Sequence, residues 1–189
     1  MSKVTWKPGT MVYPVPAVMV SCGDTIDNYN IITIAWTGTI CSDPPMCYIS
    51  IRKSRHSHAI IKKTKEFVIN ITTKDLAKAT DWCGVKSGSK FNKFKEMNLT
   101  AIKATKIKAP MIKESPINIE CKVTEIKELG THDMFLAEVV AVNADKHYLD
   151  KNGAFDLSKA NPIAYSHGHY YNLGSYIGKY GWSVEKKKK

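Results

Sequence analysis

The chain has 189 residues, of which 43% are apolar, and its net charge is +11 with an isoelectric point near 9.4. This length allows one domain with a sizeable core, which we expect at residues 1–185, followed by a solvated lysine tail at 186–189. The composition excludes a disordered chain, and no apolar run is long enough to span a membrane.

Short apolar runs rich in Val, Ile and Thr, divided by turn residues, predict a protein built mainly from strands. The first four strands are expected at residues 13–22, 30–37, 46–51 and 66–71. Two prolines in the first run favour an edge or a bulge, because proline cannot donate a ladder hydrogen bond. The third run is apolar almost throughout, which indicates burial on both faces.

Helices are expected between these strands. Residues 58–65 follow Ser57, a residue type that commonly caps helix N-termini, and residues 74–83 precede Gly84, which we expect to end a second helix. A helical turn is expected at Asn92.

Two long β-rich runs in the second half of the chain, 118–129 and 133–144, are joined by Gly-Thr-His. This pattern is typical of a hairpin with a short glycine-containing loop. A last strand and an aromatic, glycine-rich tail are expected from Asn161 onward. Six or more strands, mostly antiparallel, with a few interposed helices predict a closed or partly closed barrel, and a β-sandwich fits the helical insertions less well.

The segment IRKSRHSH, residues 51–58, places basic and hydroxyl side chains between a buried strand and a helix. A helix N-terminus favours an anion, and Arg52, Ser54 and Ser57 would add donors for a phosphate. The other explanation is that Ser57 only caps the helix and that the basic residues are solvated. We expect the neighbouring residues, listed here, to be solvated in either case: Lys53, Arg55, His56 and His58.

A second group of small polar residues, Thr33, Thr37, Gly38 and Thr39, lies where the second strand leaves the core. Gly38 would allow a ligand to approach the backbone, and Trp36 could lie against a flat ring. Taken alone, this pattern favours an ordinary core strand. By themselves, Lys93 and His132 are interpreted as a surface lysine and a turn residue.

The five cysteines include no CxxC pair, which argues against a disulfide framework and a zinc site. The segment SHGH, residues 166–169, has the spacing of some metal ligands, but Gly168 favours a loop and no acidic or cysteine partner is close in sequence. We therefore expect no metal. No hydrolase motif occurs, so no residue is expected to act as nucleophile, acid or base. The N-terminus lacks a signal peptide, which predicts a cytoplasmic protein.

With these residues identified, the chain resembles the flavin reductase-like, FMN-binding split-barrel family, and most closely its flavoredoxin branch. The resemblance covers residues 13–180 and rests on five ordered blocks: NYNIITIAWTGTICSDPPMCYISIRKSRHSHAII, EFVINI, FNKF, GTHD and HYYNLGSYIGKYGWSV. It implies a six-stranded antiparallel Greek-key barrel with flanking helices, a single FMN-binding domain over residues 1–185, and a homodimer that completes two flavin sites.

The resemblance also implies the residues of the FMN site. Arg52, Ser54 and Ser57 would bind the phosphate. The segment from Thr33 to Gly38 would line the edge of the isoalloxazine ring. The remaining implied contacts are backbone groups of Ala35, Thr37 and Gly38, side chains of Asn30, Trp36 and Lys93, and, from the same chain or its partner, His132 and Tyr165.

The function implied is electron transfer through bound FMN, with NAD(P)H or an acidic redox protein such as ferredoxin as donor. The positive charge agrees with an anionic cofactor or an acidic protein partner. One alternative is a split barrel that binds another phosphorylated ligand, as pyridoxal phosphate oxidase-like proteins do. A nucleic-acid-binding barrel is less favoured, because the aromatic residues do not alternate with basic ones along the strands, and we expect neither a nucleic acid nor a membrane as partner.

Overall fold

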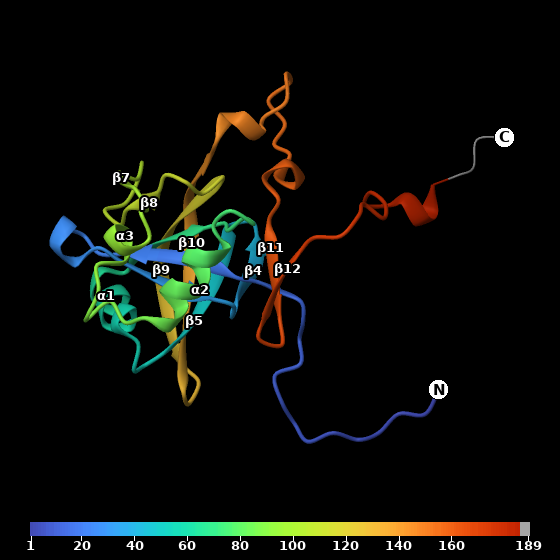
Figure 1. Cartoon of the computed structure of the whole chain (residues 1–189), viewed down its shortest axis with the longest axis horizontal. Helices are drawn as coiled ribbons and strands as arrows, with labels where there is room; N and C mark the ends of the chain where they lie inside the picture. Colours follow the sequence, from blue (N-terminus) through green and yellow to red (C-terminus); the bar gives the residue numbers. More distant parts are fainter. Residues whose placement is uncertain (186–189) are drawn as a thin grey trace.

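The structure is a computed structural model that describes residues 1–185, so the lysine tail expected at 186–189 lies outside the described residues. The body is a seven-stranded antiparallel sheet with strand order β3-β2-β6-β9-β10-β5-β4 (Figure 1). Its strands are β2 (Val18–Cys22), β3 (Asn30–Ile34), β4 (Thr37–Ser42), β5 (Pro45–Arg52), β6 (Glu66–Asn70), β9 (Ile117–Glu128) and β10 (His132–Ala144). The sheet curls until the edge strand β3 contacts β5, so the predicted antiparallel split barrel is confirmed, with seven strands in its main sheet instead of the six expected.

Smaller elements surround this sheet. Three helices, α1 (His56–Thr64), α2 (Ala77–Val85) and α3 (Lys93–Glu96), connect or cover its strands. A second sheet has the order β1-β11-β12, and a third pairs β7 with β8. The bounds of these short strands are β1 (Val15–Pro16), β7 (Ala101–Ile102), β8 (Met111–Ile112), β11 (Ile163–Ser166) and β12 (His169–Asn172). Residues 1–185 also contain four 3₁₀ helices: η1 (Ile26–Asn28), η2 (Lys146–Tyr148), η3 (Leu157–Ala160) and η4 (Trp182–Val184). Within residues 1–185 no helix is both long enough and apolar enough to cross a membrane.

The barrel core forms because alternate side chains of each strand point inward. Phe67 on β6 and Phe135 on β10 are fully buried at its centre, with Ile49 and Ile51 of β5 packed in the same cluster. Helix α1 adds Ile61 to this cluster and thereby closes one end of the barrel. The same alternation on β5 and β10 determines which of their side chains point away from the core and toward the site described below.

One continuous strand was predicted over residues 30–37. This prediction was wrong, because the segment belongs to two different strands. Strand β3 ends at Ile34 and β4 begins at Thr37 on the opposite edge of the sheet. Between them the Trp36 carbonyl accepts a hydrogen bond of 2.9 Å from the backbone N–H of Ser50 on β5. The chain therefore changes edges at Ala35–Trp36, a tertiary constraint that the local β propensity does not show.

The run predicted as one strand over residues 13–22 is also divided. Strand β1 pairs with β11, whereas β2 pairs with β3 and β6, and Ala17 separates the two. The strand predicted after Asn161 is a hairpin, β11–β12, joined by His167 and Gly168 with positive φ. The long hairpin of β9 and β10 is confirmed, with Gly130 at φ +82° in its loop.

Two predictions about helix ends were wrong. Helix α1 begins at His56 with Arg55 at the N-cap position, while the Ser57 hydroxyl turns inward and accepts a hydrogen bond from Asn30. Gly84 does not end the second helix, which continues to Val85. The helical turn expected at Asn92 is confirmed, because its side chain accepts a hydrogen bond from the backbone N–H of Lys95 at 3.1 Å.

Gly84 lies within α2 because the helix packs closely on β3. A Cβ atom at this position would lie 3.2 Å from the Thr33 Cβ, and the Thr33 hydroxyl donates a hydrogen bond to the Thr80 carbonyl of the same helix. The close contact keeps α2 beside the cavities described below.

We expect Gly84→Val to lower the free energy of unfolding by about 1–3 kcal/mol, because the added methyl groups separate α2 from β3. Urea unfolding followed by circular dichroism measures this change. Lys78→Val, at an exposed position of the same helix, shows the effect of a valine in α2 where no strand packs against it; valine has a higher helix propensity than glycine, so a loss at position 84 is not a propensity effect. Equal losses in the two variants would contradict the close-packing explanation.

Candidate functional site

Two adjoining cavities lie where the chain changes edges of the sheet. The larger has a volume of about 370 Å³ and the smaller about 220 Å³. Ile32, Arg52, Arg55 and Gly84 line both, so the two cavities share a wall. Strand β3, the end of β5 and helix α2 therefore contribute to both cavities.

The structure brings most of the predicted site residues to these cavities. Those lining the larger cavity are Thr33, Ala35, Trp36, Arg52, His132 and Tyr165. Those lining the smaller cavity are Asn30, Arg52, Ser54, Ser57 and Lys93. Thr37 and Gly38 line neither: Thr37 is buried and donates a 2.6 Å hydrogen bond to the Tyr48 carbonyl, and Gly38 packs beside the Tyr48 ring.

The smaller cavity opens at the N-terminus of α1. Among the described residues, no backbone carbonyl accepts the N–H groups of His56 or Ser57, as expected for the first turn of a helix. The exposed guanidinium groups of Arg52 and Arg55 line the same cavity, with Ser54 beside them. Free N–H groups, the positive end of the helix dipole and two guanidinium groups together favour an anion such as phosphate.

The floor of the smaller cavity is buried and polar. Asn30 Nδ2 donates a 2.7 Å hydrogen bond to Ser57 Oγ, and both side chains are almost fully buried. Gly88 packs so closely on the Asn30 amide that a Cβ there would lie 2.1 Å from Asn30 Oδ1. Glycine at 88 therefore lets the loop after α2 close over the cavity.

Lys93 lies at the same floor with only 3% of its surface exposed. Its Nζ donates a 2.6 Å hydrogen bond to the Cys83 carbonyl, at the C-terminal end of α2. Burial lowers the pKa of Lys93 to about 8, an effect that the nearby Arg55 strengthens and the nearby Cys83 and Cys22 oppose. An anion in the cavity would stabilise the charged form of this lysine.

The larger cavity has aromatic walls. Trp36, Tyr165 and Tyr170 line it, and the Tyr170 hydroxyl donates a 3.3 Å hydrogen bond to Asp81 on α2. Burial and the nearby Asp81 carboxylate raise the pKa of Tyr170 to about 12, so it remains a neutral donor. Tyr13 packs against both Trp36 and Tyr165, with ring centroids 6.1 and 6.2 Å apart. These flat side chains suit a planar aromatic ligand.

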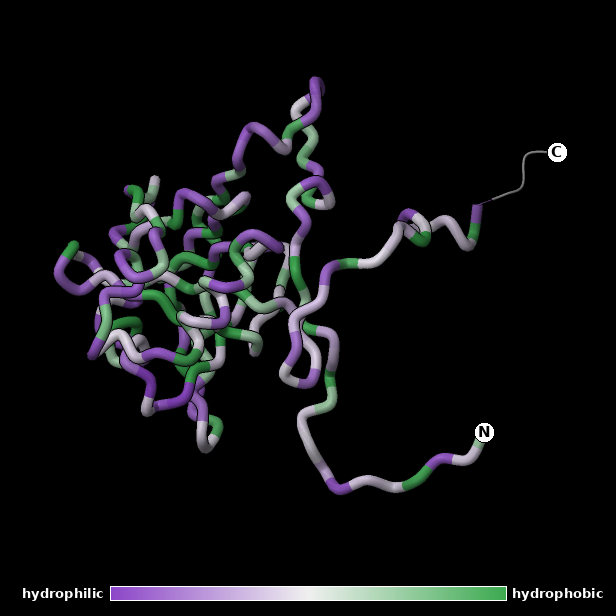
Figure 2. Tube along the Cα trace, viewed as in Figure 1, coloured by the Kyte–Doolittle hydropathy of each residue, from purple (hydrophilic) through white to green (hydrophobic). Residues whose placement is uncertain are grey.

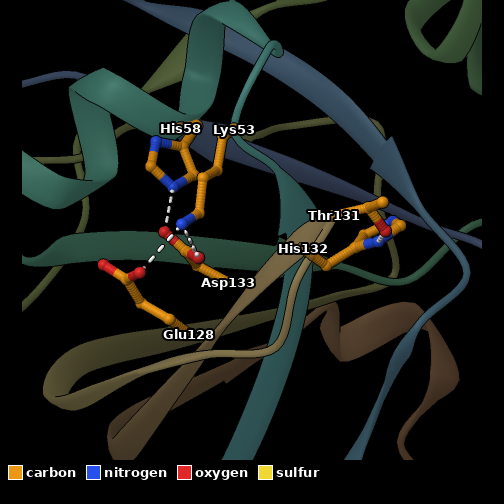
Figure 3. A network of polar contacts seen from close by, with 6 residues as sticks. All are labelled: Lys53, His58, Glu128, Thr131, His132 and Asp133. Atoms are coloured by element: carbon orange, nitrogen blue, oxygen red, sulfur yellow. Dashed lines mark hydrogen bonds and ion pairs between the residues drawn. The ribbon is translucent and has the colours of Figure 1, made fainter.

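His132 lines the larger cavity from the first position of β10, directly opposite Arg52 in the β5–β10 register. Burial and the nearby Arg52 lower the pKa of His132, so its neutral form is favoured near neutral pH. The Thr131 hydroxyl lies 2.9 Å from His132 Nδ1 and fixes the orientation of the ring (Figure 3).

Several lining residues were missed by the sequence interpretation. Arg55 was expected to be solvated but lines both cavities. Asp81 comes from a segment with no recognised motif, and Tyr170 lies in a block that carries the family resemblance but was not identified as a site residue. His58, also expected to be solvated, is buried and bonded to Asp133. Helix phase could have suggested its burial, because His58 and Ile61 are three residues apart and share one face of α1.

The two histidines of SHGH lie around the β11–β12 turn, His167 within it and His169 on β12. Within residues 1–185 no three His, Cys, Asp or Glu side chains come together as metal ligands would.

Comparison with known proteins gives consistent matches. Residues 10–174 match the family described as flavin reductase like domain. The fold is similar to flavoredoxin of Desulfovibrio vulgaris (Miyazaki F), with a TM-score of 0.90, 28% identity and coverage of 97% of this chain and 100% of the other. It is also similar to flavoredoxin from Methanosarcina acetivorans, with a TM-score of 0.87, 27% identity and coverage of 98% and 100%. An uncharacterised protein of Pyrococcus abyssi is 33% identical over 80% of this chain and 83% of its own length.

The family match covers most of the chain, and the curled antiparallel sheet has the split-barrel architecture expected of that family. The chain therefore belongs to the flavin reductase-like split-barrel family.

The buried lysine gives the ligand-free protein a pH-dependent stability. Its pKa is about 8 in the folded chain against an ordinary value of 10.5, so between these values the unfolded chain holds a proton that the folded chain has lost. The free energy of unfolding must then rise with pH across this interval. We expect Lys93→Met to remove about 1–2 kcal/mol of that rise, measured by urea unfolding at intervals between neutral pH and pH 10.5. The exposed neighbour Lys95→Met is the control, and an unchanged pH profile in the Lys93 variant would contradict a depressed pKa.

Proposed function

We propose that the protein binds FMN and passes electrons through it. The observation that carries this proposal is that a basic cavity at the start of α1 adjoins an aromatic-walled cavity and shares lining residues with it. FMN has the matching arrangement, a terminal phosphate joined by a short flexible chain to a planar ring. Membership of the family and the likeness to two flavoredoxins support the same conclusion.

The smaller cavity would hold the phosphate. Arg52 and Arg55 supply positive charge, and the N–H groups at the start of α1 supply donors directed outward from the helix. Ser54 adds a hydroxyl at the cavity wall. A cavity of about 220 Å³ closed by the loop after α2 favours a terminal phosphate, and therefore FMN over FAD.

The larger cavity would hold the ring. Trp36 and Tyr165 provide flat apolar contact, and the segment that contains Ala35 brings backbone close to the cavity where the chain changes sheet edges. When bound, the flavin supplies the electron-transfer chemistry, and the protein fixes its position and its electrostatic surroundings. His132 and Tyr165 line the cavity of their own chain, so the proposed site does not require them from a partner.

We expect the purified protein to bind FMN at least about tenfold more tightly than riboflavin, which has the same ring but no phosphate. Titration followed by flavin fluorescence measures both affinities. Arg52→Met should weaken FMN binding about tenfold or more and riboflavin binding much less, because Arg52 lines both cavities but only FMN has a phosphate for its guanidinium to neutralise. Lys62→Met, at an exposed position of α1, is the charge-matched control. Failure of the wild-type protein to bind FMN, or a preference for pyridoxal phosphate, would contradict the proposal.

The electron donor is a separate question that rapid kinetics can answer. We propose NAD(P)H or an acidic redox protein, since a chain with a net charge of +11 favours association with an acidic surface. Stopped-flow reduction of the FMN-loaded protein by NADH, NADPH and reduced ferredoxin compares the candidates. With ferredoxin as donor, the reduction rate should fall steeply as salt concentration rises, whereas a salt-independent rate would contradict electrostatic docking.

We also propose a homodimer. Two arms, residues 1–12 and 173–185, leave the body on the side of β11 and β12, and Figure 2 shows apolar segments along both. Exposed apolar side chains on these arms are Val4, Trp6, Met11, Val12, Leu173, Tyr176, Ile177, Tyr180, Trp182 and Val184. Such residues favour burial against another protein surface, and the second copy expected in this family would provide one.

Light scattering during size-exclusion chromatography should give the mass of a dimer. Replacing Tyr176 and Ile177 by serine, both more than three-quarters exposed within one chain, should shift the equilibrium toward monomer without changing the far-ultraviolet spectrum. Replacing the exposed Ile26, on η1 away from the arms, is the control. A monomeric wild-type protein would contradict the dimer.

A further inference from the structure

The residues at both ends of the anion-binding turn converge on one buried carboxylate. Lys53 is the first residue of the turn at residues 53–55, and His58 follows the turn in the first helical turn of α1. Figure 3 shows both side chains directed at Asp133: His58 Nε2 lies 2.8 Å from Oδ2, and Lys53 Nζ lies 3.4 Å from Oδ1. The turn is thus held at both ends by a residue more than 70 positions further along the chain.

Asp133 and the preceding residue, His132, have different surroundings because they lie on opposite faces of β10. Successive side chains of β10 point to opposite faces, so His132 lines the larger cavity whereas Asp133 points inward with Phe135. The His58 ring packs edge-on against Phe135, with centroids 5.3 Å apart, which fixes the imidazole beside the carboxylate. Neither Asp133 nor its two partners line the cavities.

A buried carboxylate at position 133 is unfavourable without the side chains of Lys53 and His58 beside it. The Asp133 side chain is 1% exposed, and within the described residues its Oδ1 accepts no hydrogen bond and faces only the Lys53 ammonium. Burial tends to raise the pKa of Asp133, but His58 and Lys53 outweigh this effect and hold the pKa below its ordinary value. A leucine or valine would fill the end of the barrel with less desolvation, so the charge is not what packing alone would favour.

We propose that Asp133 is a positioning residue that holds the turn before α1 in the geometry needed to bind the phosphate of the flavin. This inference rests on the proposed function, because it assigns Asp133 a role at the same site. By bonding Lys53 and His58, the carboxylate draws both side chains away from the ligand and fixes the backbone between them. Arg55, His56 and Ser57 then line the smaller cavity, and among the described residues no backbone carbonyl accepts the N–H groups of His56 and Ser57.

Glu128 completes the network without sharing this role. It lies 2.9 Å from Lys53 Nζ, but its side chain is two-thirds exposed and it does not contact His58. A solvent-exposed pair of this kind adds little to the order of the turn. The buried Asp133 is therefore the group that joins the two ends.

A role in phosphate positioning can be separated from a general role in stability by comparing FMN with riboflavin. Asp133→Ala should lower the ratio of FMN affinity to riboflavin affinity about ten- to hundredfold, because only FMN uses the turn. Asp133→Asn keeps an acceptor for His58 but removes the charge that faces Lys53, so it should give a smaller loss of the same ratio. It provides the decisive measurement if the alanine variant does not fold.

Glu120→Gln is the matched control. Glu120 is a fully buried carboxylate on β9 that accepts 2.7 Å hydrogen bonds from the N–H groups of Thr105 and Lys106, far in sequence from the turn. Its substitution should lower the melting temperature but leave the affinity ratio within about twofold of wild type.

The outcomes distinguish this inference from the proposed function. Wild-type protein that binds no FMN overturns the proposed function and the inference with it. Wild-type protein that binds FMN, together with a wild-type affinity ratio in the folded Asp133 variants, overturns the inference alone. A selective loss of FMN affinity in those variants, absent in Glu120→Gln, supports it.

Discussion

The site depends on the crossing at Ala35–Trp36, where the chain leaves one edge of the sheet and enters the other. The hydrogen bond from the Ser50 N–H to the Trp36 carbonyl ties this crossing to β5 and keeps the sheet curled. Because of the curl, β3 lies against β5, and Asn30 at the start of β3 reaches Ser57 in the first turn of α1. Without this closure, Asn30 on β3 and the turn after β5 would lie near opposite edges of an open sheet.

Burying a positive charge near the site costs desolvation free energy, and the fold avoids this cost for the arginines but not for Lys93. Lys93 is buried in the smaller cavity and its pKa falls to about 8, which shows that the ligand-free cavity stabilises a cation poorly. The arginines avoid this problem because both remain exposed at the rim. An anionic ligand would remove the unfavourable desolvation of Lys93, so the same residue that lowers the stability of the ligand-free protein can favour binding.

Much of the fold could be predicted from the sequence, because alternation and turn residues act locally. The β9–β10 hairpin follows from its alternating side chains and Gly130, and the helical turn at Asn92 follows from a capping side chain. The break within residues 30–37 could not be predicted, because the local sequence favours one strand and only the contact with β5 divides it. Among the candidate site residues, Thr37 and Gly38 lie outside both cavities because β4 turns away after the crossing.

For the basic stretch after β5, the sequence does not show which side chains face the cavities and which pack inside the protein. Its charge pattern indicates an anion but does not say which side chains would face one. The structure divides these residues by geometry: Arg52 and Arg55 line the cavities, whereas Lys53 and His58 meet the buried Asp133. The division depends on the pleat of β10 and the phase of α1, and neither is visible in composition. Counting positive charges therefore overestimates the number available to a ligand, since two of these basic residues hold the turn that the other two would use.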